Sequence, residues 1–150
     1  MWDEIKGKIE FELKQLEKLN RLNSSLLKRI KNKKPNQIEL LAFSSLLHSF
    51  YTGIENIFKR IGQEIDNKLP SNSVWHQKLL EQMVKSTSTR PPVISKELKE
   101  ELAEYLAFRH IFRNLYSFEL DWKKIKPLVV KLKSVLKNFN EEIDSFLKKL

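Results

Sequence analysis

The chain has 150 residues, of which 41% are apolar and 31% are charged, and its formal net charge is +9 at pH 7. It contains no cysteine, which excludes disulfides, thiolate metal sites and a cysteine nucleophile, and its three glycines are isolated rather than gathered in a phosphate-binding loop. The length predicts one compact domain over residues 1–150. Because the chain opens on a charged segment and has no apolar run of about 18 residues, we expect a cytoplasmic protein with no membrane contact.

Basic side chains gather toward the two ends of the chain. Residues 1–34 carry ten basic and five acidic side chains, and residues 121–150 carry eight and four. The densest cluster is Lys28–Lys34, with five cations in seven residues. Such a cluster attracts a polyanion such as RNA, and it equally suits a solvated helix C-terminus. Few aromatic residues are interleaved with these lysines, so the sequence does not predict a stacking platform for single strands there.

Apolar residues at helical spacing begin at Trp2 and predict a long first helix. The segment Lys33-Lys34-Pro35-Asn36 should end this helix, because proline disfavours helical geometry at the residue before it. A second helix should start near Pro35 and continue to Ile65. Gly53 within it predicts the close approach of another helix or chain.

A turn at Leu69–Ser73 predicts a shorter third helix over Val74–Lys85, capped by Asn72 or Ser73. The polar segment Ser86–Pro92 has a double proline and predicts a loop.

Two further helices complete the chain. Ser95 is a predicted N-cap for a fourth helix that continues to Leu115. Asp121 is the predicted cap of a fifth helix, with Pro127 causing a kink or a delayed start. No alternating β pattern appears, so the sequence predicts an all-α, antiparallel bundle of about five helices. The apolar surface of the first two helices is also wide enough for a dimer.

Polar and aromatic residues are concentrated in the stretch Tyr105–Tyr116 of the fourth helix. At about 3.6 residues per turn, Arg109, Arg113 and Tyr116 should line one stripe, with His110 and Asn114 on the adjoining one. Two arginines four positions apart repel each other mildly, which predicts an anionic partner. That partner is either an acidic side chain, such as Glu55 of the second helix, or a phosphate.

The sequence gives no support for a metal site or another cofactor. The three histidines, His48, His76 and His110, fall on three different predicted helices, and none pairs with a carboxylate at a ligand spacing. We expect His48 at the edge of the core and His76 in a structural role at the start of the third helix.

The stretch Arg109–Tyr116 resembles the Arg-x4-6-His motif of the HEPN superfamily, in the form of its HepT-like branch. Phe50–Phe58 and Trp75-His76 extend the resemblance over nearly the whole chain. It implies a helical bundle that forms a homodimer, with two copies of the motif across a cleft. Many such proteins are metal-independent endoribonuclease toxins that cleave RNA. They are encoded beside a minimal nucleotidyltransferase antitoxin that can nucleotidylate the motif tyrosine.

Carried onto this chain, the resemblance makes Arg109 the motif arginine, His110 the polar residue after it and Tyr116 the modified tyrosine. Asn114 takes the place of the catalytic histidine, and an amide cannot exchange a proton near neutral pH. His110 is then the candidate acid or base, with Asn114 orienting its imidazole and Arg113 binding substrate with Tyr116. Arg109 and Arg113 would stabilise charge on the phosphorane. The alternative is a catalytically silent HEPN-fold module that binds a nucleotidyltransferase partner or RNA.

Overall fold

The computed structural model describes residues 2–150, and these residues form helices joined by loops, with no β-strand. The elements in chain order are α1 (Asp3–Ile30), α2 (Gln37–Glu64), α3 (Trp75–Val84), α4 (Lys96–Asn114), the 3-10 turn η1 (Ser117–Glu119) and α5 (Trp122–Lys148). The predicted all-α fold with five helices is confirmed. Within residues 2–150, no helix is both long and apolar enough to cross a membrane.

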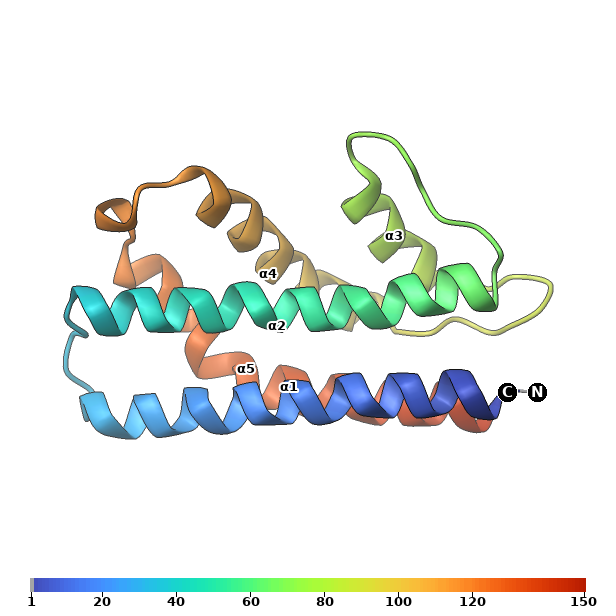
Figure 1. Ribbon diagram of the computed structural model, residues 1–150, viewed down its shortest axis with the longest axis horizontal. Helices are drawn as coiled ribbons and strands as arrows, with labels where there is room; N and C mark the ends of the chain where they lie inside the picture. Colours follow the sequence, from blue (N-terminus) through green and yellow to red (C-terminus); the bar gives the residue numbers. More distant parts are fainter. Residues whose placement is uncertain (1) are drawn as a thin grey trace.

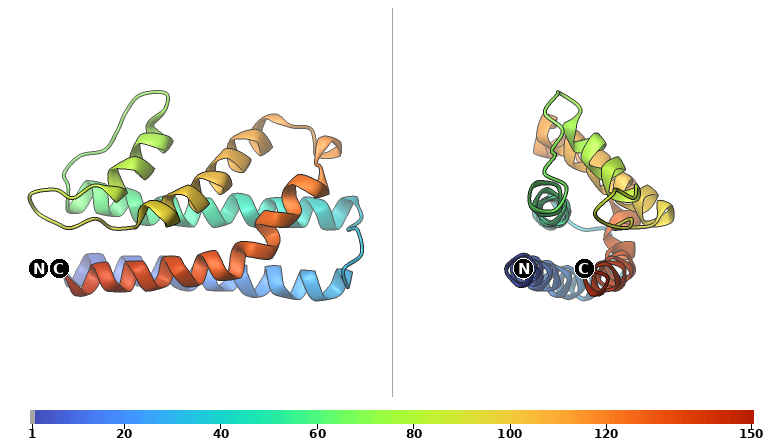
Figure 2. Two further views of the ribbon diagram at one scale, coloured as in Figure 1. Left: turned by 180° about the vertical axis from the view of Figure 1, so that it is seen from behind. Right: turned by 90° about the vertical axis from the view of Figure 1, so that its right-hand side faces the viewer.

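The helix α2 is the centre of the fold and packs against each of the other four helices. It lies antiparallel to α1, while the second half of α5 runs beside α1, behind it in the view of Figure 1 (Figures 1 and 2). The helices α3 and α4 cover the opposite face of α2 and pack against each other. Aromatic residues fill the core between these layers, including Phe43, Phe50 and Phe139, all with no exposed surface.

The helices α1 and α2 approach closely at Gly53, as the sequence predicts. A Cβ atom at this position would lie 2.6 Å from Cδ2 of Leu16 on α1. Leu16 is fully buried, so it has little room to move away. A residue without a side chain therefore sets the spacing between the two longest helices.

Side-chain caps fix the start of three helices. Asn36 and Glu39 form a reciprocal capping box at α2. The predicted caps Ser95 and Asp121 accept hydrogen bonds from Leu98 N at α4 and from Lys123 N at α5. Each cap satisfies a backbone N–H that has no partner within its helix.

The end of α1 differs from the prediction. The helix ends at Ile30, before the segment Lys33–Asn36 that was expected to end it. Lys31 and Asn32 adopt left-handed backbone angles, with φ of 49° and 64°, and Lys33 N donates back to Ile30 O. Because asparagine tolerates this geometry well, the chain turns before the proline restricts it.

The predicted delayed start of α5 is wrong, because the helix begins at Trp122 and contains Pro127. A proline inside a helix removes one backbone hydrogen bond and its ring crowds the preceding turn. The helix is correspondingly bent rather than straight (Figure 2), as the alternative of a kink predicts.

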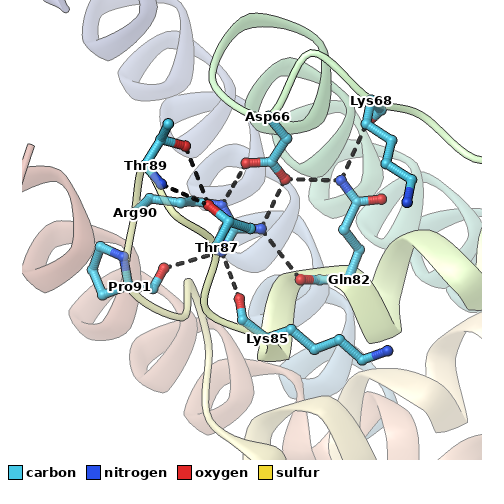
Figure 3. A network of polar contacts seen from close by, with 8 residues as sticks. All are labelled: Asp66, Lys68, Gln82, Lys85, Thr87, Thr89, Arg90 and Pro91. Carbon is cyan, nitrogen blue, oxygen red and sulfur yellow. Dashed lines mark hydrogen bonds and ion pairs between the residues drawn. The ribbon is translucent and has the colours of Figure 1, made fainter.

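The loop between α3 and α4 holds a buried arginine that sequence analysis did not single out. Arg90 is 4% exposed, and its Nε and one terminal nitrogen donate to the two carboxylate oxygens of Asp66 at 2.7 and 2.8 Å (Figure 3). The same guanidinium donates to the carbonyl oxygens of Gln82, Lys85 and Pro91. This cluster, the Arg90 clamp, ties the end of α3 and the following loop to the segment just after α2.

Candidate functional site

The candidate site is a groove of about 660 Å³ between α3 and α4. His76 and Gln77 line it from the first turn of α3, and Arg109, His110 and Arg113 line it from the last turns of α4. The rest of the lining is largely apolar and comes from the same two helices and from Ser73 and Val74, just before α3. The groove therefore gathers the arginines and one histidine of the predicted motif with a second histidine from another helix.

A buried ion pair underlies the groove. One terminal nitrogen of Arg109 donates to both carboxylate oxygens of Glu55, at 3.0 Å each, and the two side chains are 2% and 5% exposed. The other terminal nitrogen donates to Thr52 Oγ1 at 3.3 Å, and the guanidinium lies 4.9 Å from the centre of the Tyr51 ring. The sequence predicts either an acidic side chain or a phosphate as the partner of Arg109, and the structure shows the acidic side chain, Glu55.

Tyr51 is fully buried beside this ion pair. Burial, with the nearby Glu55 charge, raises the pKa of its hydroxyl well above the ordinary value of 10.0. The phenol therefore stays neutral, and its ring contributes a cation–π contact to Arg109.

His76 contacts both members of this ion pair. It is a functional candidate that the sequence did not reveal, since the sequence predicts only a structural role for it. Its Nδ1 lies 2.7 Å from Glu55 Oε2 and 3.1 Å from the Arg109 nitrogen. When Nδ1 donates its proton to the carboxylate, Nε2 remains available to a ligand in the groove. The Trp75 ring packs on the imidazole at 3.7 Å between centroids, which further fixes its orientation. The signal in the sequence was the Trp75-His76 pair within the family resemblance.

His110 and Arg113 lie exposed at the rim of the groove. Within residues 2–150, no carboxylate lies within 4 Å of the Arg113 guanidinium, so its charge is available to an anionic ligand. Asn114 does not hold the His110 imidazole: its amide donates to the His110 carbonyl oxygen at 2.9 Å. The expected orienting role of Asn114 is thus replaced by a bond to its own helix.

Tyr116 does not share the stripe predicted for it with Arg109 and Arg113. The helix α4 ends at Asn114, and Leu115 is extended, with φ of −100° and ψ of 148°. This break carries Tyr116 into the turn before η1, where it is 71% exposed and stacks on Phe118. The stripe prediction failed because it continued helical geometry two residues too far.

His48 lies on α2, half-buried at the edge of the core as expected, with its ring 5.7 Å from that of Phe112. Burial lowers its pKa below the ordinary value, and the charges of Arg113 and Arg109 lower it further. His48 does not line the groove between α3 and α4. In the described part of the chain, no three histidine or carboxylate side chains converge as metal ligands would.

Comparison with known families identifies a relationship over most of the chain. The sequence profile of a family described as HepT-like protein matches residues 42–150, which include most of α2 and all of α3, α4 and α5. Neither the curated proteins nor the solved structures include a significant match to this chain.

Proposed function

The chain belongs to the HepT-like protein family of the HEPN superfamily, and on this basis we propose that it is a toxin-type protein that cleaves RNA in the α3–α4 groove without a metal ion. The observation that carries the proposal is the position of His76, which is hydrogen-bonded to a buried carboxylate and lines the same groove as Arg113 and His110.

These residues suit cleavage by the neighbouring ribose hydroxyl. His76 Nε2 accepts the proton of the 2′-hydroxyl as the 2′-oxygen bonds to phosphorus. The bond from phosphorus to the 5′-oxygen then breaks, and that oxygen takes a proton from His110. The products are a 2′,3′-cyclic phosphate and a 5′-hydroxyl. Arg113 stabilises the negative charge on the phosphorane.

Arg109 acts in this scheme as a positioning residue. Its charge is already paired with Glu55, and the pair holds the His76 ring at the wall of the groove. A buried guanidinium whose two terminal nitrogens already have partners has little capacity left for a substrate phosphate. The sequence assigns charge stabilisation to both Arg109 and Arg113, and in this proposal only Arg113 keeps that role.

The test is the cleavage of a mixed cellular RNA pool by purified protein in the presence of a chelator. We expect His76→Gln and His110→Ala each to lower the cleavage rate by about 10²–10⁴-fold, the usual size of a general acid or base contribution. His48→Gln is the matched control, because His48 lies outside the groove, and its rate should stay within a few-fold of the parent. Full activity in His76→Gln would remove His76 from the mechanism.

The family also suggests the protein's partners. We propose a homodimer and a minimal nucleotidyltransferase antitoxin that modifies Tyr116, whose 71% exposure leaves its hydroxyl open to an enzyme. Exposed apolar side chains on α1, Phe11 and Leu22, support an interface between copies. Light scattering on the purified protein should give twice the mass of one chain, and a monomer would contradict the dimer. Incubation with the antitoxin and a nucleotide should add mass to the parent and none to Tyr116→Phe.

The second candidate function is that of a catalytically silent binding module. It is favoured by the amide at position 114, which stands in place of the motif histidine and bonds only to its own helix. Clean, folded parent protein that cuts no RNA, together with cleavage gained in Asn114→His, would establish this second function. An active parent excludes it.

A further inference from the structure

The turn between α4 and α5 presents two stacked aromatic rings to solvent. Tyr116 and Phe118 are 71% and 74% exposed, and their rings are nearly parallel, 3° apart in plane with centroids 5.5 Å apart. Such exposed aromatic side chains contribute little to the core. Paired on a surface, they are typical of a binding site.

The fold places this aromatic pair beside the basic turn between α1 and α2. Gln37, in the first turn of α2, donates a hydrogen bond of 2.6 Å from its side-chain amide to the carbonyl oxygen of Ser117 in η1. Figure 1 shows the α1–α2 turn and η1 at the same end of the molecule, opposite the chain termini. Residues that are about 80 positions apart in the sequence therefore form one surface, which we name the basic end: residues 28–39 and 116–126.

The basic end carries more than half of the net charge of the protein. Its two segments contain eight basic and three acidic side chains, a net charge of +5 out of +9. Each acidic side chain there is engaged: Glu39 in the α2 capping box, Glu119 with the Tyr116 backbone, and Asp121 at the start of α5. Glu39 also lies 3.9 Å from Arg29. Lys31, Lys33 and Lys34 of the α1–α2 turn are exposed, and among the described residues no carboxylate lies within 4 Å of their side-chain nitrogens.

We propose that the basic end is a binding site for single-stranded RNA, in which bases stack on Tyr116 and Phe118 while the phosphates lie against Lys33 and Lys34. This rests on the proposed function only in taking RNA as the ligand. Charge alone would fit any polyanion, but flat, parallel rings suit unpaired bases, which expose their faces as duplex bases do not. The sequence did not predict a stacking platform here because the aromatic pair and the lysines are adjacent only in the folded chain.

The test measures binding without cleavage. The probe is a fluorescent 2′-O-methyl oligouridylate of about twelve nucleotides, within the usual range of single-strand sites. The missing 2′-hydroxyl prevents cleavage, so fluorescence anisotropy reports affinity alone. Phe118→Ala should weaken binding about tenfold or more, the loss expected when a base loses its stacking partner. The control is Val130→Ala, an apolar residue on α5 that is 56% exposed and lies outside both the basic end and the α3–α4 groove, and it should change affinity less than twofold.

A second pair of variants tests the charges. Lys33→Gln with Lys34→Gln should weaken binding and reduce the slope of log affinity against log salt by about 1.4, since each phosphate contact to a single strand contributes about 0.7. Lys148→Gln with Lys149→Gln removes the same charge at the opposite end of the molecule and should leave the slope unchanged.

Several outcomes would overturn the proposal. Unchanged affinity in Phe118→Ala removes the stacking platform, and equal binding of an RNA duplex removes the preference for single strands. Binding of vesicles with anionic lipid, or of an acidic protein, in place of the probe assigns the surface to another partner. A protein that binds the probe through the basic end but cuts no unmodified RNA disproves the proposed cleavage and leaves this inference intact. If the protein cleaves RNA and these variants change neither cleavage nor probe binding, this inference is disproved and the proposed cleavage remains.

Discussion

Both carboxylate oxygens of Glu55 accept a hydrogen bond from the same guanidinium nitrogen of Arg109, each at 3.0 Å, although the two residues are 54 positions apart in the sequence. Both side chains are almost fully buried. Removing one partner of such a pair leaves an uncompensated charge in the protein interior, which is more costly than losing an ion pair at the surface.

Glu55→Gln should therefore lower the free energy of unfolding by about 3 kcal/mol, as measured by urea denaturation. The control is Glu104→Gln, which breaks a pair of similar length between Glu104 and Lys131, 2.9 Å apart, whose side chains are 55% and 43% exposed. Exposed pairs contribute about 0–1 kcal/mol, so this variant should lose less than that. Equal losses in the two variants would contradict the importance of burial at Glu55.

Gly53→Ala should destabilise the protein by about 1 kcal/mol. The added methyl group would collide with buried Leu16 across the α1–α2 interface, and this overpacking of about 1–3 kcal/mol exceeds the helical preference of alanine over glycine, about 1 kcal/mol. Gly7→Ala is the control, because no atom lies within 4 Å of the new Cβ there apart from the chain neighbours and the backbone of its own helix. It should stabilise the protein by up to about 1 kcal/mol, and thermal unfolding of both variants checks the opposite signs.

Arg90→Lys should lower the free energy of unfolding by about 2–3 kcal/mol, because a lysine cannot reproduce the forked contacts to Asp66 and the three carbonyl oxygens. Arg60→Lys makes the same exchange at a half-exposed site, where one 3.5 Å contact to Glu64 is lost, and should change stability by less than about 0.5 kcal/mol. Guanidinium denaturation of the two variants gives the comparison. An unchanged free energy of unfolding in Arg90→Lys would show that the clamp does not stabilise the fold.

The lowered pKa of His48 predicts a dependence of stability on pH. The folded pKa lies below the ordinary 6.5, so the unfolded chain takes up more protons as the pH falls past this value. The contribution of His48 to stability is thus complete above about pH 6.5 and is lost as the pH falls toward the folded pKa. His48→Gln should show a shallower loss of stability than the parent between pH 7.5 and 5, measured by urea denaturation at each pH. Identical slopes would contradict the shift.

Much of the fold follows from local signals in the sequence. Helical spacing of apolar residues indicates five helices, and Ser95 and Asp121 cap helices where the sequence predicts them. The residue at which α1 ends cannot be predicted in this way, because the left-handed backbone angles at Lys31 and Asn32 depend on how the turn closes and not on the proline alone. The Arg90 clamp was missed for a related reason, since its partner Asp66 is 24 positions away.

In the candidate site, too, some contacts can be predicted from the sequence and others cannot. Glu55 is predictable as a partner of Arg109, because two arginines four positions apart need a nearby anion. The contact of His76 with this pair is not predictable. It joins three helices, with Glu55 and Arg109 lying 21 and 33 positions from His76 in the sequence, and no local pattern covers such separations. Tyr116 shows the opposite error, a local pattern extended past the end of its helix.

The helix that carries His76 is the shortest α-helix among residues 2–150. With ten residues, α3 is below the length of about 12–15 at which a helix is marginally stable alone. Glu55 holds it through His76 near one end, the Arg90 clamp holds it at the other, and three buried apolar side chains lie between. Such a segment is suited to open as a separate cooperative unit while the long helices stay packed. We therefore expect the groove, and the contact that orients His76, to be lost at a free energy below that of global unfolding.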